Sequence, residues 1–237
     1  MKRRPGYERL RGSKNTASDR RVTRDRSCDR KAVFCSRLAR AALFPPGVCS
    51  AVPVAWWRSL SHSGRSKING RLDALVNNAG ISPKSDDGGR LNTLETDLRT
   101  WGKVFHVNFF ASVVLARGLK DELSAAKGAV VNVTSIAGAR VHPFAGAAYS
   151  TSKAALAALT REMAHDFGPL GVRVNAIAPG EVETSILSPG TEKIVETLPL
   201  RRLGQPSEVA DVIYFLCSDQ SSYVTGTEIE VNAGQHV

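Results

Sequence analysis

The stretch "LVNNAG", residues 75–80, places apolar residues directly before two asparagines and a glycine. Buried strand positions favour apolar side chains, so amides at the end of such a strand need hydrogen-bond partners there. In α/β proteins, the carboxyl ends of parallel strands form the edge at which ligands bind. The stretch therefore predicts a buried strand that ends at a ligand site.

Strand-like and helix-like patterns alternate from Arg71 onward. Besides 72–80, β-branched and apolar runs predict strands in "GAVVNVTS" (128–135), "GVRVNAIAPG" (171–180) and "TEIEVNAG" (227–234). Apolar spacing predicts helices from about Asn92 to Leu123, over 147–167 and over 206–218. This alternation predicts an α/β fold, a parallel sheet with helices on both faces in three α/β/α layers.

The first seventy residues differ from the rest in charge and in pattern. They hold 17 Lys and Arg residues against 4 Asp and Glu, whereas residues 71–237 hold 15 against 18. The first thirty residues have no apolar period and are predicted to be solvated or disordered. Weaker patterns predict a short amphipathic helix over 32–44 and a short strand over 51–57. We divide the chain into a basic segment, 1–67, and an α/β domain, 68–237.

The composition argues against several classes of protein. The chain contains no run of eighteen apolar residues, so a membrane span is not expected. The basic charges are scattered and match no nucleic-acid-binding module. The cysteines form no C-x-x-C pair, so neither a zinc site nor a disulfide framework is expected, and a reducing, cytoplasmic location fits best. We interpret three histidines as incidental and expect no metal site; they are His106, His142 and His165.

Tyr149 and Lys153 form a Y-x-x-x-K pair within the predicted helix 147–167. A separation of four residues places both side chains on one helix face, one turn apart. Because a nearby cation favours the phenolate, we expect the pKa of Tyr149 to fall from about 10 toward neutrality. A tyrosine tuned in this way can exchange a proton with a substrate hydroxyl or carbonyl.

Three further polar residues are candidates for the site, and two of them, Ser135 and Asn108, also have a structural interpretation. Ser135 ends a predicted strand at the ligand edge, or it simply caps a turn. Asn108 interrupts the apolar run "VFHVNFFASVVL" (104–115), where a local kink with bound water would satisfy its amide, or where it bridges helices. Thr184 offers a hydroxyl just beyond the Pro-Gly turn at 179–180.

Taken together, these motifs resemble the short-chain dehydrogenase/reductase family, which includes 3-oxoacyl-carrier-protein reductases and related sugar or alcohol dehydrogenases. The resemblance rests on "LVNNAG", Asn108, Ser135, Tyr149 with Lys153, and "VNAIAPGEVET" (174–184), in the family's order over about residues 68–237. It implies a Rossmann-type, doubly wound parallel sheet. It also implies an oxidoreductase that transfers a hydride between NAD or NADP and a carbonyl or secondary alcohol.

The resemblance also implies a role for each site residue. Tyr149 is the general acid and base, Lys153 lowers its pKa and binds the nicotinamide ribose, Ser135 holds the substrate oxygen, and Asn108 anchors a water in the proton relay. The cofactor would also contact Asn78, Ala79, Gly80, Val182 and Thr184. The segment from about Glu183 to Leu200 would form a mobile lid. The Ala-rich helix face after Tyr149 would join subunits in a homodimer or homotetramer.

One expected motif of the family is missing from this chain. A Gly-rich turn, T-G-x-x-x-G-x-G, should precede "LVNNAG" by about seventy residues and bring the backbone close to the cofactor's pyrophosphate. At that distance the chain has "LRGSKNTAS" (10–18), in which Gly12 is the only glycine. The first βαβ unit is therefore predicted to be abnormal or missing, and the residue that selects NAD or NADP is not identifiable.

Three explanations of residues 1–67 stay open. The first is a shifted reading frame or a mistaken gene start, which would leave residues that do not resemble the family. The second is a basic targeting or nucleic-acid-binding arm, although Asp19, Asp25 and Asp29 argue against a transit peptide. The third is a diverged segment that folds in the usual way. Under the first, the chain would bind cofactor poorly. The alternative function is then a catalytically impaired family member that acts at most as a binding or oligomerisation partner.

Overall fold

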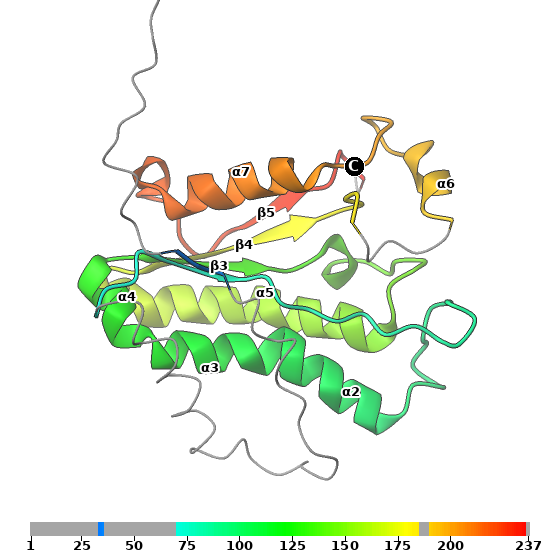
Figure 1. The fold of residues 1–237 in the computed structure, drawn as a ribbon, viewed down its shortest axis with the longest axis horizontal. Coiled ribbons are helices and arrows are strands. Elements are labelled where there is room, and N and C mark those ends of the chain that lie inside the picture. Colours follow the sequence, from blue (N-terminus) through cyan, green and yellow to red (C-terminus); the bar gives the residue numbers. More distant parts are fainter. Residues whose placement is uncertain (1–32, 36–69, 185–189, 236–237) are drawn as a thin grey trace, which may run out of the picture. The chain divides into compact units, whose positions relative to one another are not determined.

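A parallel β-sheet forms the centre of the protein. The structure, a computed structural model, describes residues 33–35, 70–184 and 190–235. Within these residues five parallel strands lie in the order β1-β2-β3-β4-β5 (Figure 1). Their bounds are Val33–Cys35, Ala74–Asn77, Ala129–Val133, Arg173–Pro179 and Glu228–Val231. The four strands predicted from the sequence are confirmed as β2 to β5.

The buried asparagine of the opening motif, Asn77, is paired across the sheet. Asn77 of β2 lies opposite Asn132 of β3, and its Nδ2 donates to Asn132 Oδ1 at 2.8 Å. Asn132 Nδ2 in turn donates to Thr160 Oγ1 at 2.9 Å. Because burying an unpaired amide is costly, this ladder explains how a strand interior tolerates these side chains. It also connects two central strands to a helix.

The helices confirm the predicted pattern with one shifted start. Their bounds are α2 Leu98–Phe105, α3 Ala111–Gly118, α4 Lys120–Ala126, α5 Ala147–Phe167, α6 Glu192–Val195 and α7 Pro206–Cys217. The prediction that helix begins near Asn92 is wrong. The Asn92 side chain instead accepts the backbone N–H groups of Leu94 and Glu95 in a turn. Asp97 then caps α2 by accepting Thr100 N–H at 2.9 Å.

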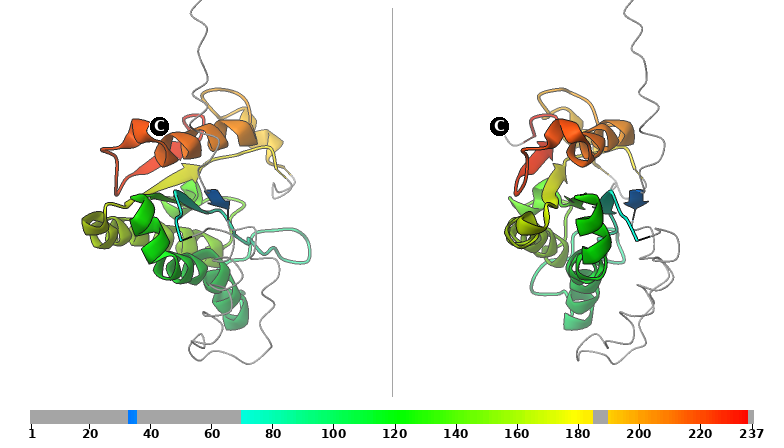
Figure 2. Two further views of the ribbon diagram at one scale, coloured as in Figure 1. Left: turned by 60° about the vertical axis from the view of Figure 1, so that its left-hand side comes forward. Right: turned by 90° about the vertical axis from the view of Figure 1, so that its left-hand side faces the viewer.

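Helices cover both faces of the sheet, as the sequence predicts. Alternate strand residues point to opposite faces, so Leu75 and Val130 face a core shared with α3, α4 and α5, whereas Val76 and Val131 face α7. Figure 1 shows α7 on one side of the sheet and α5 with α3 on the other, and Figure 2 shows the same layers from two further directions.

The connection through α7 has an unusual hand. β3, β4 and β5 follow one another across the sheet in a single direction, yet α5 and α7, which join them, cover opposite faces. Two crossovers of the same hand would put both helices on one face, and about 98% of parallel crossovers are right-handed. The β4–α7–β5 connection therefore has the opposite hand to β3–α5–β4. This arrangement brings the start of α7 to the carboxyl ends of the strands.

The strand β1 corrects part of the expectation for the amino-terminal segment. Val33–Cys35 lies in the run 32–44 that was predicted to be a helix, but it pairs in parallel with Ala74–Val76 of β2. A β-branched and an aromatic residue favour this strand over the short helical period around it. The edge of β2 is thus covered, as the explanation by a diverged segment requires. The predicted strand over 51–57 lies outside the described residues.

The described residues contain neither a membrane-spanning helix nor a cluster of metal-binding side chains. No helix in this part of the chain is long and apolar enough to cross a membrane. The same residues contain no group of three or more His, Cys, Asp or Glu side chains that could hold a metal ion.

Gly128 and Gly102 provide a matched test of the fold. A Cβ at Gly128, where β3 begins, would lie 2.6 Å from the Leu72 carbonyl oxygen, whereas a Cβ at Gly102, exposed in α2, would meet nothing within 4 Å. We expect Gly128→Ala to lower the free energy of unfolding by about 2 kcal/mol through overpacking. Gly102→Ala should raise it by about 0.5 kcal/mol through helix propensity. Urea unfolding of both variants checks this, and equal effects would contradict the packing at β3.

Candidate functional site

A cavity of about 440 Å³ opens at the carboxyl ends of β2, β3 and β4. Its lining includes the residues that follow each strand: Asn78 and Gly80 after β2, Thr134 and Ser135 after β3, and Gly180 to Val182 after β4. The start of α7 contributes Pro206 and Val209. The ligand edge inferred from "LVNNAG" is therefore hollowed and lined by polar strand ends, as parallel sheets favour.

Lys153 is the most deeply buried cation of this cavity. Its side chain is 3% exposed, and Nζ donates to the Val133 carbonyl oxygen at the end of β3, at 2.7 Å. A Cβ at Gly80 would lie 3.4 Å from Nζ, so the absence of a side chain there leaves room beside the ammonium. Burial lowers the pKa of Lys153 to about 8. The lysine is thus anchored to the sheet while its remaining N–H donors stay available to a ligand.

Tyr149 and Ser135 meet Lys153 at the same edge. Lys153 Nζ lies 5.7 Å from the centroid of the Tyr149 ring, which confirms that both side chains share one face of α5. The Ser135 side chain hydrogen-bonds Tyr149. Ser135 also caps the short 3-10 helix η4, Ile136–Gly138, by accepting the Ala137 N–H at 3.2 Å. The catalytic and the capping interpretations of Ser135 are therefore compatible.

A close backbone approach holds η4 against α5. A Cβ at Gly138 would lie 2.8 Å from Ala154 N and 3.0 Å from the Lys153 carbonyl carbon. Only a residue without a side chain fits this contact without a shift of the backbone. The contact sets the distance between the turn that carries Ser135 and the helix that carries Tyr149 and Lys153.

The expected fall in the pKa of Tyr149 is wrong for this structure. Burial raises its pKa and the charge of Glu181 adds to the rise, while the hydrogen bond with Ser135 acts in the opposite direction. Lys153 does not produce the expected fall: its ammonium is bound to the Val133 carbonyl oxygen and lies 5.7 Å from the centroid of the ring. Its own lowered pKa also reduces its charge above about pH 8.

Asn108 lies behind the cavity, within a kinked part of its helix. It belongs to the π-helix η3, His106–Phe110, between α2 and α3, and is 1% exposed. Its Oδ1 accepts the Ile81 N–H at 2.8 Å, and its Nδ2 donates to the Ile81 carbonyl and the Ser152 Oγ, both at 3.0 Å. The π-helical turn matches the predicted local irregularity, and three hydrogen bonds to protein groups satisfy the amide as a bridge between segments. Asn108 thereby fixes the loop after Gly80 to α5.

The predicted cofactor contacts mostly converge on the cavity. Asn78, Gly80, Val182 and Thr184 line it, whereas Ala79 does not. Of the predicted lid from Glu183 to Leu200, residues 185–189 lie outside the described part of the chain, and α6 occupies 192–195. The arrangement fits the nicotinamide end of a dinucleotide, because Gly80 leaves space beside the Lys153 ammonium and Thr184 offers a hydroxyl at the rim.

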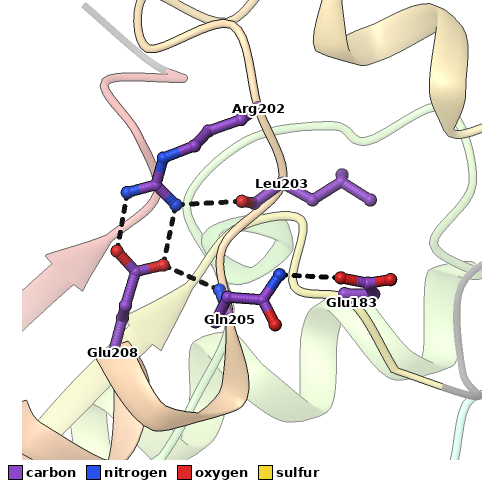
Figure 3. A network of polar contacts seen from close by, with 5 residues as sticks. All are labelled: Glu183, Arg202, Leu203, Gln205 and Glu208. Carbon is purple, nitrogen blue, oxygen red and sulfur yellow. Dashed lines mark hydrogen bonds and ion pairs between the residues drawn. The ribbon is translucent and has the colours of Figure 1, made fainter.

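A polar network fixes both segments that flank residues 185–189. Arg202 forms a bidentate ion pair with Glu208, the carboxylate of Glu208 accepts the Gln205 N–H at 2.7 Å, and Gln205 Nε2 donates to Glu183 at 2.7 Å (Figure 3). The hydrogen bond and charge of Arg202 lower the pKa of Glu208 to about 2. Backbone bonds between Glu181, Glu183 and Gly204 run alongside. The rim after β4 is therefore tied to the start of α7.

Three further charged or titratable residues line the cavity: Lys84 and Glu181, which no sequence pattern singled out, and His142, which was interpreted as incidental. His142 Nε2 lies 2.8 Å from Glu181 Oε1, and each side chain is 10% exposed. Lys84 Nζ donates to the Phe144 carbonyl, and burial lowers the pKa of Lys84 while Glu181 opposes the decrease. The interpretation of His142 as incidental is therefore wrong. A charged residue directly after a Pro-Gly turn at a strand's carboxyl end was the available signal for Glu181.

Comparison with known proteins gives matches over the same part of the chain. A family model described as "Enoyl-(Acyl carrier protein) reductase" matches residues 59–236. Protein FixR of Bradyrhizobium diazoefficiens is 59% identical over 181 residues, which cover 76% of this chain and 65% of FixR. The chain thus spans less than two thirds of the length of that curated relative.

Solved structures extend the similarity to three dimensions. An oxidoreductase of the short chain dehydrogenase/reductase family from Brucella ovis, in complex with a partially ordered NAD, is 58% identical. The match has a TM-score of 0.61 and covers 74% of this chain and 71% of that chain. The 3-oxoacyl-[acyl-carrier protein] reductase from Brucella melitensis is 34% identical with a TM-score of 0.72, covering 79% and 71%.

The burial of Lys153 predicts a pH dependence of stability. Its pKa of about 8 in the folded chain lies below the ordinary lysine value of 10.5, so the unfolded chain binds the proton more tightly between these values. The free energy of unfolding should therefore rise with pH across this window. Relative to Lys153→Met, the wild-type protein should gain about 3 kcal/mol between pH 7.5 and 10.5. Urea unfolding at each pH measures it.

The exposed Lys103 provides the control for this measurement. Lys103→Met should follow the wild-type pH dependence, because its side chain lies in water. If Lys153→Met followed the same curve as the wild-type protein, the burial of the Lys153 ammonium would be refuted.

Proposed function

This chain belongs to the short-chain dehydrogenase/reductase family, and we propose that it transfers a hydride between NAD(H) or NADP(H) and a carbonyl or secondary-alcohol substrate. The observation that carries the proposal is the convergence of Tyr149, Lys153 and Ser135 on one cavity at the carboxyl edge of the sheet. Similarity to an oxidoreductase solved with a partially ordered NAD supports a nicotinamide cofactor.

Tyr149 is the proposed general acid and base. When bound, a nicotinamide supplies or accepts the hydride. In reduction, Tyr149 gives its phenolic proton to the oxygen of the substrate carbonyl, and Ser135 donates a hydrogen bond to the same oxygen. The raised pKa of Tyr149 keeps the phenol protonated at neutral pH, the form that reduction needs. Alcohol oxidation needs the phenolate, so it becomes more favourable as the pH rises.

Lys153 and the strand ends are proposed to hold the nicotinamide end of the cofactor. The ammonium is fixed by Val133 and can donate its other protons to ribose hydroxyls. Asn78, Gly80, Val182 and Thr184 would contact the rest of this end from the cavity wall. Asn108 acts as a positioning residue, because it holds the backbone at Ile81.

The assembly and location of the protein are also proposals. We propose a cytoplasmic homodimer or homotetramer that acts on a small molecule and binds neither nucleic acid nor membrane. Exposed small residues on α5, Ala154 and Ala158, would allow close helix packing between subunits. The negative charge balance of residues 71–237 disfavours a nucleic-acid partner.

A second candidate function follows from the missing Gly-rich turn. The five glycines of residues 1–70 stand at 6, 12, 47, 64 and 70, and none of them completes the family's G-x-x-x-G-x-G spacing. Without this turn the backbone loses its close approach to the cofactor's pyrophosphate. The candidate is a catalytically impaired family member that serves at most as a binding or oligomerisation partner.

Replacing the tyrosine tests the proposed chemistry. Tyr149→Phe removes the proton donor, and we expect a loss of at least about 100-fold in the rate of ketone reduction. The half-buried ring remains, so the unfolding midpoint should stay near that of the wild-type protein. Tyr223→Phe, at an exposed tyrosine remote from the cavity lining, is the control. The assay uses millimolar NADPH or NADH, so that weak cofactor binding does not hide the chemistry. Retained turnover in Tyr149→Phe would exclude this mechanism.

Titration with cofactor separates the two candidate functions. Because the Gly-rich turn is absent, we expect a dissociation constant for NADPH and NADH well above about 1 μM, measured by cofactor fluorescence. Residual affinity should fall further in Lys153→Met but not in Lys103→Met. Micromolar affinity in the wild-type protein would refute the impaired candidate. Undetectable affinity at millimolar cofactor would refute the oxidoreductase instead.

A further inference from the structure

Glu181 presents a buried carboxylate to the cavity beside the proposed proton donor. The residue follows the Pro-Gly turn at the end of β4 and is 10% exposed, and its Oε1 lies 2.8 Å from His142 Nε2. A carboxylate accepts about four hydrogen bonds, and water satisfies them when the group is exposed. Because Glu181 also lines the cavity, its carboxylate can accept a hydrogen bond from a ligand bound there.

His142 lies beside the Glu181 carboxylate. Its Nδ1 accepts the Phe144 backbone N–H at 3.3 Å, and its Nε2 lies 2.8 Å from Glu181 Oε1. The hydrogen bond from Phe144 thus holds the imidazole next to the carboxylate. The aromatic ring of Phe144 lies 6.0 Å from the imidazole centroid and packs behind it.

Lys84 balances the carboxylate from a neighbouring loop. Its ammonium donates to the Phe144 carbonyl and interacts electrostatically with Glu181. Because Lys84 and Lys153 both place positive charge along the cavity, a cationic ligand would be repelled by one while it approached Glu181. A neutral hydrogen-bond donor meets no such penalty. The wall therefore favours a hydroxyl group over an ammonium group.

We propose that the substrate carries a hydroxyl group next to the reacting carbon, and that Glu181, which lies beside His142 in the cavity wall, accepts its hydrogen bond. The substrate class is then an α-hydroxy ketone, reduced to a vicinal diol. This proposal rests on the proposed hydride transfer and adds its substrate class. A purely aliphatic acyl chain would leave the carboxylate desolvated without a partner, so the wall disfavours long 3-oxoacyl thioesters.

The reaction balances without Glu181 changing protonation. The cofactor's hydride forms a new bond to the carbonyl carbon, and the carbonyl π bond breaks toward its oxygen, which takes the proton of Tyr149. NAD(P)H is oxidised and the ketone is reduced. The neighbouring hydroxyl keeps its proton throughout and only donates it in a hydrogen bond to Glu181.

Acetoin and butan-2-one test the proposal, since they differ by one hydroxyl group beside the carbonyl. With the full chain and millimolar NADPH, we expect kcat/KM for acetoin to exceed that for butan-2-one at least about tenfold. Glu181→Leu should reduce this ratio to about one, and Glu181→Gln, which keeps an acceptor oxygen, should retain part of it. Glu162→Gln, at an exposed position of α5, is the matched control and should leave the ratio unchanged.

A binding measurement without cofactor keeps this test separate from the proposed function. Saturation-transfer NMR should detect acetoin in preference to butan-2-one on the wild-type protein but not on Glu181→Leu, with thermal unfolding confirming that the variant folds. If the protein reduced neither ketone but still bound acetoin in preference to butan-2-one, the result would refute hydride transfer and support the inference. Equal binding of both ketones, a preference that survives Glu181→Leu, or preferred reduction of acetoacetyl-CoA would overturn the inference.

Discussion

The hydrogen bond from Lys153 to the Val133 carbonyl connects the long helix α5 to the carboxyl end of β3, and the site depends on it. A buried ammonium without an acceptor is costly, so the bond fixes the position of the lysine and of the helix turn that carries Tyr149. Gly80 and Gly138 permit this arrangement, because a side chain at either position would meet Lys153 or its backbone. The catalytic face is therefore built by backbone contacts as much as by the polar side chains that it displays.

Competing electrostatic effects set the pKa values of Tyr149 and Lys153. Burial raises the pKa of Tyr149 and the charge of Glu181 adds to the rise, while the hydrogen bond with Ser135 acts in the opposite direction. The same burial lowers the pKa of Lys153 to about 8, which weakens the cation just where its charge would matter. The balance keeps the phenol protonated near neutral pH, which is the form that the proposed carbonyl reduction would need.

Much of the fold could be predicted from sequence, because its signals are local. The β-branched runs gave β3 and β4, and the Ala-rich period over 147–167 gave α5 to the residue. Local patterns failed where tertiary contacts decide: Val33–Cys35 pairs with β2 despite a weak helical period, and Asn108 finds its partners in the loop at Ile81. His142 and Glu181 are 39 positions apart in sequence, so no spacing rule connects them, although they lie 2.8 Å apart in the fold.

The nicotinamide end and the pyrophosphate end of the proposed cofactor site differ in the binding energy that they can contribute. Binding energy from remote parts of a ligand orients its reacting group, and the pyrophosphate contacts of a Gly-rich turn are such a remote part. This chain keeps the strand-end residues that would meet the nicotinamide but lacks that turn in its sequence. Orientation of the ring would then depend on Lys153 and the strand ends alone. A site built in this way loses affinity first, while the geometry of proton transfer at Tyr149 stays in place.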